Sequence, residues 1–375
     1  MTGLEIAIIA DDLSGALDAA APFAAHGFTT EVALSADHLD GLAEPAVVAV
    51  STASRHLSPA EAGARVRQAA LALAGRSPRI VFRKIDSRLK GNLESETRAL
   101  LEVFPRSRLM VAPAVPALGR QVVEGFVTGA GVPAPLAVRQ HFGGLGLAIE
   151  VPEAMDQMAL DGLAEDLVAA AADVLAIGAR GLAEGLARQL GKGREIAQIQ
   201  AQVPVARLPA PFAMAIGSRD PITLRQVETL LAAFPDLVVV TAPDGAVGDR
   251  SVPLGASALF LCTGGGAGGA EQDVARRFAA GVAAYIHDGD FAGILASGGD
   301  TAAALMAALD VGLIHPRGEV SPGVPWSHIA LGPGEAVTLV TKSGGFGRAE
   351  LLADLVGGVM AASPGILSSS AQRPS

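Results

Sequence analysis

The chain contains 375 residues, half of them hydrophobic and 18% charged, and it carries a formal net charge of −10. This length exceeds one ordinary hydrophobic core, so we expect two domains. The acidic balance argues against a nucleic-acid partner and against an anionic membrane surface. Glycine, proline or charged residues interrupt every apolar run before it reaches about 20 residues, which argues against a membrane-spanning helix.

The cysteine content, the first residues and the net charge indicate the compartment of the protein and the kinds of partner it can bind. Cys262 is the only cysteine, which favours a reducing, cytoplasmic compartment. The first residues, MTGLEIAII, include Glu5 and no basic flank, so they indicate a strand rather than a signal peptide. A small anionic substrate is compatible with an acidic chain, because a local group of cations can outweigh the global charge. A homo-oligomer stays open.

In the first half of the chain, short apolar segments alternate with segments of helical spacing. We expect strands at residues 6–10, 30–34, 46–50, 80–83, 109–112 and 174–177, and helices from residue 14 onward and at 59–74, 93–104 and 181–190. Pro22 lies inside the first helix and should kink or end it. This alternation predicts a mostly parallel sheet flanked by helices.

A proline-rich segment, VPVARLPAPF at residues 203–212, predicts a linker before a second α/β series. In that series we expect strands at residues 212–216, 237–241, 258–262, 291–296 and 336–341, and helices at 221–234, 271–287, 301–309 and 348–360. The predicted fold is therefore α/β with two domains, each a mostly parallel sheet flanked by helices. The domains are expected at residues 1–205 and 212–362, followed by a disordered tail at 363–375.

Five groups of polar residues follow predicted strands, where ligand sites of open α/β sheets are built. The first is Asp11 and Asp12, directly after the opening strand. Two adjacent carboxylates at this position can bind sugar hydroxyls, hold magnesium or act as a base. Alternatively, Asp12 or Ser14 is only the N-cap of the following helix.

The second group is the basic loop RKIDSRLKGN at residues 83–92, with four cations in eight residues. Such a loop suits a carboxylate or a phosphate, although a solvated surface is the alternative interpretation. Its candidate ligand-binding residues are Arg83, Lys84, Asp86, Ser87 and Lys90. Arg120, in a later loop, is a weaker candidate for the same site.

Two further groups are glycine turns between a strand and a helix, and both suit phosphate binding through backbone N–H groups. One comprises Ser297, Gly298, Gly299, Asp300 and Thr301, of which Asp300 or Thr301 also suits a helix N-cap. The other comprises Lys342, Ser343, Gly344 and Gly345. Gly217 and Ser218 close another strand and offer similar donors. The phosphate-binding motif G-x-x-x-x-G-K-[ST] is absent, so a nucleotide site here is of another type.

A rival pattern is G-x-G-x-x-G at Gly264, Gly266 and Gly269, with Asp288 and Asp290 about twenty residues further on. It would indicate an NAD-dependent oxidoreductase acting on a small hydroxy acid. The segment is so rich in glycine that the pattern arises almost by default. Beside an enzyme that uses a nucleotide and an oxidoreductase, the third alternative is a non-catalytic protein that binds a sugar acid.

Six segments together resemble the four-carbon acid sugar kinase family, which includes D-threonate, D-erythronate and 3-oxo-tetronate kinases. They are IAIIADDLSGALDAAAPFAAHG, RKIDSRLKGN, VAPAVPALGR, AIGSRDPITLRQ, SGGDTAAAL and VTKSGGFG, in this order along the chain. The resemblance implies an N-terminal domain that binds the sugar acid and a C-terminal domain that binds ATP. It implies that the sugar acid is bound by Asp12, Arg83, Lys84, Asp86, Ser87 and Lys90. We add Asp11 and Arg120 to these candidates, because Asp11 is adjacent to Asp12 and Arg120 lies in a later loop that suits the same site.

For ATP the resemblance implies Ser218, Gly298, Gly299, Asp300, Thr301 and Gly344, to which position adds Ser297, Lys342, Ser343 and Gly345. The expected reaction is phosphoryl transfer from ATP to a hydroxyl of the acid in a cleft between the domains, with Mg²⁺ bridging the phosphates. Asp12 is the preferred carboxylate to orient or deprotonate the hydroxyl, and Asp300 is the other candidate.

Overall fold

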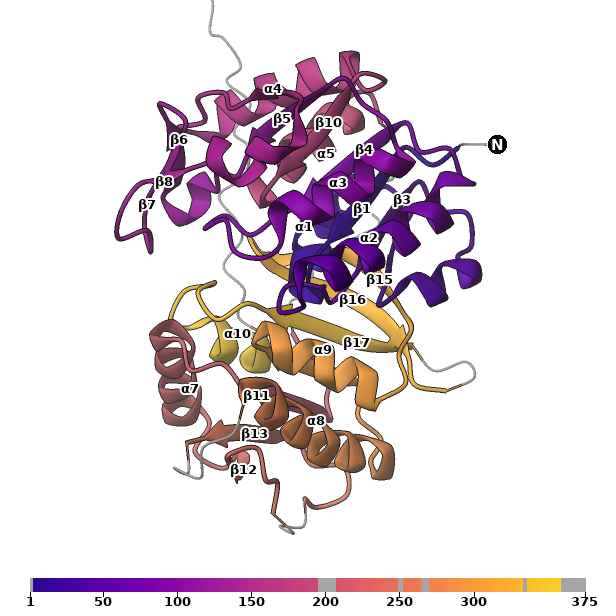
Figure 1. Ribbon diagram of the computed structural model, residues 1–375. Coiled ribbons are helices and arrows are strands. Elements are labelled where there is room, and N and C mark those ends of the chain that lie inside the picture. Colours follow the sequence, from indigo (N-terminus) through magenta and orange to yellow (C-terminus); the bar gives the residue numbers. More distant parts are fainter. Residues whose placement is uncertain (1–2, 195–206, 249–251, 265–269, 333–335, 359–375) are drawn as a thin grey trace, which may run out of the picture.

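The computed structural model describes residues 3–194, 207–248, 252–264, 270–332 and 336–358. We call residues 3–194 the N-terminal half and residues 207–358 the C-terminal half; they form the upper and lower parts of Figure 1. In these ranges no helix is long and apolar enough to cross a membrane. The predicted tail at 363–375 lies outside the described residues, as do residues 203–206 of the predicted linker.

The N-terminal half is a parallel sheet with helices on both faces, as the sequence predicts. Its strands, in spatial order, are β2 (Thr30–Ala33), β3 (Val47–Ser51), β1 (Ile6–Ala10), β4 (Ile80–Lys84), β10 (Val174–Gly178), β5 (Arg108–Ala112) and β9 (Ala148–Glu150). The helices are α1 (Leu13–Ala25), α2 (Pro59–Ala74), α3 (Leu93–Val103), α4 (Gln157–Ala169) and α5 (Arg180–Gly191), with 3-10 turns at Ala36–Gly41, Pro116–Leu118 and Arg139–Leu145. A small antiparallel sheet follows β5 and consists of β6 (Arg120–Val123), β7 (Phe126–Gly129) and β8 (Leu136–Ala137).

The C-terminal half contains a second parallel block of strands. In spatial order they are β12 (Val238–Pro243), β13 (Ala258–Thr263), β11 (Phe212–Ile216), β14 (Gly293–Ser297) and β17 (Ala336–Lys342). An antiparallel hairpin lies beside β17 and is formed by β15 (Leu313–Ser321) and β16 (Val324–Ala330). The helices are α7 (Pro221–Ala233), α8 (Glu271–Asp288), α9 (Gly299–Ala308) and α10 (Leu351–Gly357).

The prediction of two separate sheets is wrong, because the hairpin joins both blocks into one 14-stranded sheet. Leu313 and Ile314 at the start of β15 pair antiparallel with β2, and the rest of β15 pairs with β16. The sequence of the hairpin is interrupted by Pro316, Gly318 and Pro325, which normally indicate a loop. Shifts in register within β15 accommodate these residues as bulges.

Helix α1 continues through Pro22, which was expected to kink or end it. Proline leaves the carbonyl oxygen four residues earlier without its helical donor, and here that oxygen belongs to Asp18. The guanidinium of Arg180 donates to it over 3.5 Å. The helix then runs on to Ala25, where the N–H of His26 is bonded to the carbonyls of Pro22 and Phe23.

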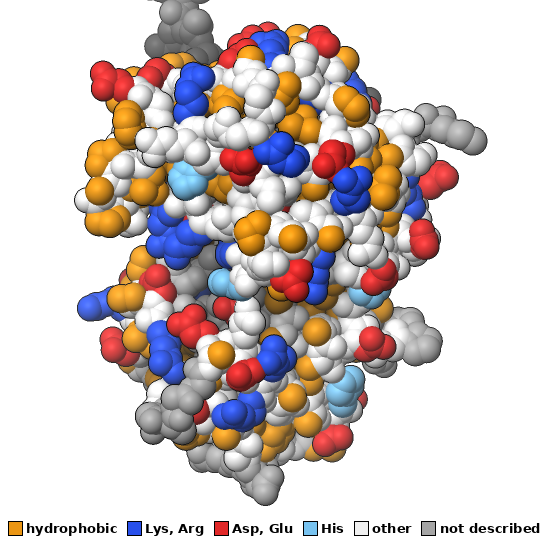
Figure 2. Space-filling model, in the orientation of Figure 1, with side chains coloured by type: hydrophobic (Ala, Val, Ile, Leu, Met, Phe, Trp, Pro, Cys, Tyr) orange, Lys and Arg blue, Asp and Glu red, His pale blue; other side chains and the backbone are white. Residues whose placement is uncertain are grey.

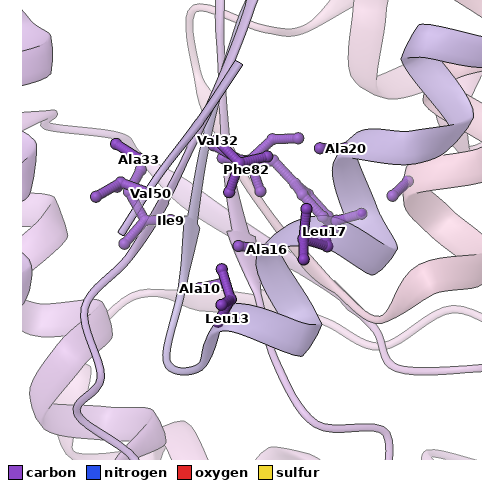
Figure 3. Close-up of a cluster of buried hydrophobic side chains, with 14 of the residues drawn as sticks. Ile9, Ala10, Leu13, Ala16, Leu17, Ala20, Val32, Ala33, Val50 and Phe82 are labelled. Carbon is purple, nitrogen blue, oxygen red and sulfur yellow. The ribbon is translucent and has the colours of Figure 1, made fainter. Parts of the chain in front are cut away.

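One continuous hydrophobic core extends through both halves, and a smaller cluster lies on the other face of the C-terminal block. Alanines on α1 allow this helix to approach the sheet closely: Figure 3 shows Ala16, Leu17 and Ala20 on the side of the sheet to which Val32 and Phe82 point. The helix that follows Asp12 is thereby held rigidly at the centre of the molecule (Figure 1).

Candidate active site

A cavity of about 390 Å³ lies between the two halves, and we call it the cleft cavity. It is lined by residues just beyond the carboxyl ends of strands in both parallel blocks, where ligands bind in open α/β sheets. From the N-terminal half these are Asp12 after β1, Arg55 after β3, Lys84 at the end of β4 and Arg180 after β10; from the C-terminal half they are Ser218 after β11, Gly298 and Gly299 after β14, and Ser343, Gly344 and Gly345 after β17. The space-filling view shows a hollow here, with Lys and Arg side chains on its rim (Figure 2).

Asp12 is both a helix cap and a wall of the cleft cavity, so the two interpretations of this residue are compatible. Its Oδ1 accepts the backbone N–H of Gly15 at 2.6 Å, and its Oδ2 is bonded to the guanidinium of Arg55. Burial raises the pKa of Asp12 above its ordinary value, and the positive charge of Arg55 offsets part of this rise. A carboxylate with a raised pKa is a stronger base than an ordinary aspartate.

Asp11 lies behind Asp12, fully buried and outside the lining of the cavity. Arg55 binds it in a bidentate manner, with Nε–Oδ2 and Nη2–Oδ1 distances of 2.9 and 2.8 Å. Although burial alone would raise the pKa of Asp11, the ion pair with Arg55 brings it below its ordinary value. Asp11 therefore fixes Arg55, and Arg55 in turn positions Asp12.

The basic loop divides into residues that face the cavity and residues that do not. Lys84, Asp86, Ser87 and Arg88 line it, together with Arg120. Arg83 is fully buried on the other side, where it pairs with Glu96 and donates to the carbonyl of Ile9 at 3.1 Å. Lys90 is exposed and is not part of the lining.

Lys84 is almost fully buried, and its ammonium group lies close to the carboxylate of Asp12. A Cβ atom on Gly15 would come within 2.6 Å of Asp12 Oδ1 and 3.2 Å of Lys84 Nζ. Both groups therefore contact the space that a side chain at position 15 would occupy. The Nζ atom is 3.9 Å from a carboxylate oxygen of Asp18. The end of the cavity nearest Gly15 therefore combines two carboxylates with one ammonium group.

A second cavity, of about 420 Å³, extends into the C-terminal half. It shares Ser218, Gly298 and Gly299 with the cleft cavity, and its remaining lining is Gly217, Arg219, Asp244, Cys262, Gly264, Glu271, Val274, Ala275, Phe278, Asp300 and Thr301. The two spaces therefore meet at the glycine turn before α9. Asp300 and Thr301 face the second cavity, whereas the hydroxyl of Ser297 is buried outside both linings.

The glycine turns require residues without side chains. Gly298 has φ of +108°, and a Cβ atom there would lie 3.2 Å from the backbone N of Ser218. A Cβ atom on Gly344 would lie 2.4 Å from the hydroxyl oxygen of Ser218. The first N–H groups of α9 and the hydroxyl of Ser218 thus border a space kept free of side chains, which is the form of a phosphate site.

Lys342 supports the second glycine turn from behind. Its Nζ donates to the hydroxyl of Thr223 and to the carbonyl of Gly344, both at 2.9 Å, and to the carbonyls of Ser343 and Phe346 at 3.2 and 3.3 Å. Burial lowers its pKa to about 8. Lys342 lies outside the lining of both cavities and fixes the shape of the loop.

The residues of the rival pattern G-x-G-x-x-G and its two acidic residues do not lie together in one described site. Gly264 lines the second cavity, whereas Gly266 and Gly269 lie outside the described residues. Asp288 and Asp290 line a different cavity of about 110 Å³. The carboxylates expected to bind a dinucleotide ribose are therefore not in the cavity that Gly264 borders.

Five charged residues among those described in the lining of the cleft cavity were missed from the sequence: Asp18, Arg55, Arg88, Arg180 and Asp220. Arg55 and Arg180 are the first cations after β3 and β10, so the strand-end rule that singled out Asp12 and Lys84 also applies to them. Asp18 gave no such signal, because it lies on the second turn of α1. Its role is apparent only once α1 and α5 are placed together.

Two family models match the chain. One, described as a sugar-binding N-terminal domain, matches residues 6–140, and the other, a nucleotide-binding C-terminal domain, matches residues 261–352. A D-threonate kinase of Cupriavidus necator is 32% identical over 91% of this chain and 94% of its own length. This chain belongs to the four-carbon acid sugar kinase family. The family predicted from the six segments is thereby confirmed, and with it the assignment as a phosphotransferase of the sugar-acid kinase class.

Further members of the family align over nearly the full chain. A D-threonate kinase of Bordetella bronchiseptica is 28% identical over 94% of this chain and 96% of its own length. A D-erythronate kinase of Heliobacterium modesticaldum is 26% identical over 92% and 94%. Crystal structures of a Salmonella typhimurium LT2 protein (TM-score 0.71, 21% identity, 94% and 98% covered) and of Haemophilus influenzae protein HI1011 (TM-score 0.66, 20% identity, 93% and 98% covered) share the fold.

Proposed function

We propose that this kinase transfers the terminal phosphoryl group of ATP to a hydroxyl of a four-carbon sugar acid such as threonate or erythronate, in the cytoplasm. The acid occupies the cleft cavity against the N-terminal domain, residues 1–205, and ATP occupies the second cavity in the C-terminal domain, residues 212–362. The observation that carries this proposal is the junction of the two cavities at Gly298 and Gly299, opposite Asp12. A substrate on each side of that junction presents its reacting end to the other.

The fit to a nucleotide rests on the cradle at the junction. The glycines at 298 and 344, with the hydroxyls of Ser218 and Thr301, leave room for phosphate oxygens next to backbone donors. The rest of the second cavity, including Phe278, Val274 and Ala275, offers an apolar surface for a base. Lys342 contributes indirectly, by holding the loop that carries Ser343, Gly344 and Gly345.

Magnesium is compatible with the acidic side chains of the cradle. No group of three or more His, Cys, Asp or Glu among the described residues could hold a metal ion, but Mg²⁺ commonly uses one or two carboxylates together with substrate phosphates. Asp300, in the second cavity, and Asp220, in the cleft cavity, are the candidates. A bound Mg²⁺ would neutralise phosphate charge.

At the acceptor side, Asp12 is preferred over Asp300 as the base. Asp12 lines the cleft cavity and its Oδ2 lies 3.9 Å from where a Cβ atom of Gly299 would be, whereas Asp300 lines only the second cavity. The substrate hydroxyl gives its proton to the Asp12 carboxylate as its oxygen bonds to the terminal phosphorus, and the bond from that phosphorus to ADP breaks. Lys84, beside Asp12, balances the charge that develops on the transferring group.

The proposal is tested with the purified protein, Mg-ATP and a panel of D- and L-threonate, D- and L-erythronate and 3-oxo-tetronate. Coupled detection of ADP should report turnover with at least one of these acids and none with a neutral four-carbon polyol. Absence of ADP with every acid of the panel would contradict the proposal.

A further inference from the structure

Of the described residues, five that line the cleft cavity are cationic and differ in how their charge is balanced: Arg55, Lys84, Arg88, Arg120 and Arg180. Arg55 is neutralised by Asp11 and also contacts Asp12. Arg180 is bidentate to Glu319, with N–O distances of 2.5 and 2.7 Å. Because both guanidinium groups are engaged by carboxylates of the protein, they hold the walls of the cavity and do not select an anionic ligand.

Lys84 lies at the end of the cavity where the phosphoryl group is proposed to be transferred. It is close to the carboxylates of Asp12 and Asp18, and it donates to the carbonyl of Ile85 at 3.3 Å. A substrate carboxylate placed beside Lys84 would also face these two acids. Because Asp12 and Asp18 already balance its charge, and because it lies beside the proposed base Asp12, Lys84 is assigned to the site of phosphoryl transfer and not to the carboxylate of the acid.

Arg88 and Arg120 are the cations of the cleft cavity with no carboxylate at ion-pair distance among the described residues. The guanidinium of Arg120 donates to the hydroxyl oxygen of Ser87 at 2.8 Å and to the carbonyl of Ala130 at 2.9 Å, and both acceptors are neutral. Arg88 is exposed, and within the part of the chain that the structure describes only its backbone N–H is bonded, to the carboxylate of Asp86 at 2.8 Å. Their side-chain charges are thus available to a ligand.

The two guanidinium groups also lie near enough to repel one another. Burial lowers the pKa of Arg120, and the charge of Arg88 lowers it further, while Asp86 offsets only part of the effect. An anion bound between the two arginines would remove this repulsion. The hydroxyl of Ser87 accepts from Arg120, so its own hydrogen can be donated to the same anion.

We propose that Arg88 and Arg120 bind the carboxylate of the substrate, with Ser87 as a third donor, and that this pair makes the enzyme select an acid over the corresponding neutral compound. This inference rests on the proposed function and specifies which cations recognise the carboxylate of the substrate. Arginine is suited to the task, because its planar fork can bind a carboxylate through two hydrogen bonds. Arg88 was not among the site residues predicted from the sequence.

The test compares a charged and an uncharged substrate across variants. Wild type, Arg88→Ala, Arg120→Ala and the double variant are assayed with the tetronate that wild type phosphorylates best and with its primary amide. For each single variant, kcat/KM for the acid should fall by about 10- to 100-fold, while kcat/KM for the amide should change by less than about threefold. Equal losses for acid and amide, or no loss for the acid, would overturn the assignment.

A control and a second readout make the result specific. Arg139→Ala removes an exposed arginine outside the cavity and should leave both substrates unaffected. Binding of D-threonate and D-erythronate, measured by calorimetry without ATP, should weaken in both arginine variants to the same extent as kcat/KM. A wild-type protein that binds these acids without forming ADP would refute the kinase proposal alone, whereas unchanged binding in the variants would refute the carboxylate assignment alone.

Discussion

Asp12 shows how one side chain can serve the fold and the site together. It caps α1 through Gly15 and faces the cleft cavity through its other oxygen. The sequence placed Asp12 at the end of a strand but could not supply its counter-ion, which comes from Arg55, 43 residues further along the chain. Contacts of this separation depend on strand order, and local patterns do not contain that information.

Replacing Asp12 by Asn should lower kcat by about 100- to 10,000-fold, because the proposed base is lost. Asparagine is also a good N-cap, so α1 should keep its start and the melting temperature should change little. Steady-state kinetics and thermal unfolding check the two parts. An unchanged kcat in a folded variant would exclude Asp12 as the base.

The pH profile gives a separate test of Asp12. The base must be ionised, and burial raises the pKa of this carboxyl, so activity is retained above the raised pKa and lost as the pH falls through it. The acidic limb of kcat/KM should therefore lie at a higher pH than an ordinary aspartate would give. A profile that stays flat down to the ordinary range of aspartate would contradict this.

Lys342 links stability to alkaline pH. Burial lowers its pKa in the folded protein to about 8, from an ordinary value of 10.5. Between these values the unfolded chain binds more protons than the folded one, so the contribution of Lys342 to the free energy of unfolding rises with pH across this window. In Lys342→Met this rise should disappear from denaturant unfolding curves recorded between pH 7.5 and pH 10. The same variant should raise KM for ATP, because the loop carbonyls lose their donor.

At the scale of elements, the regular strands and helices are those that the sequence predicts best. Strands such as β1 and β10 are buried along their whole length and have continuous apolar sequences, and α2 starts with a capping box at Ser58 and Glu61. The hairpin of β15 and β16 escapes prediction, since its prolines and glycines resemble a loop. Pairing with β2 and β17 overrides that local preference.

The hairpin is also fixed to the site by charge. Glu319 on β15 binds Arg180, which lines the cleft cavity, and it accepts the backbone N–H of Gly323 at 2.9 Å. Phe346, in the glycine loop of the C-terminal half, packs against Gly323 so closely that a Cβ atom there would lie 2.1 Å from its ring. The tip of the hairpin therefore connects a wall of the cleft in one half with the glycine loop of the other.

Glu319→Ala should destabilise the protein by about 3–5 kcal/mol, because it leaves the buried guanidinium of Arg180 without its main carboxylate. The matched control is Glu165→Ala, which removes an exposed pair with Lys192 and should cost less than about 1 kcal/mol. Denaturant unfolding of both variants measures the difference. Equal small losses would mean that Arg180 does not depend on Glu319.

At the scale of the whole molecule, the two cavities should bind their ligands independently in the absence of the other substrate. Gly298→Ala places a side chain at φ of +108° next to Ser218, so it should weaken ADP binding by about tenfold or more and leave acid binding nearly intact. Arg120→Ala, which changes a residue of the cleft cavity only, should weaken binding of the acid and leave ADP affinity nearly intact. Calorimetric titration of each ligand separately checks both, and a parallel loss of both affinities in either variant would contradict the division.

The shared sheet has a consequence for how the chain is made. During synthesis the N-terminal half leaves the ribosome first, but the neighbour of β2 on one side is β15, whose first residues are 313 and 314. Until these residues emerge, β2 presents unpaired backbone groups, which are prone to pair with another nascent chain. The sheet of the N-terminal half is therefore complete only after β15 has been synthesised. This strand begins more than 100 residues after Arg194, the last described residue of the N-terminal half. A fragment cut at the linker would carry this open edge permanently, and it should aggregate where the full-length protein does not.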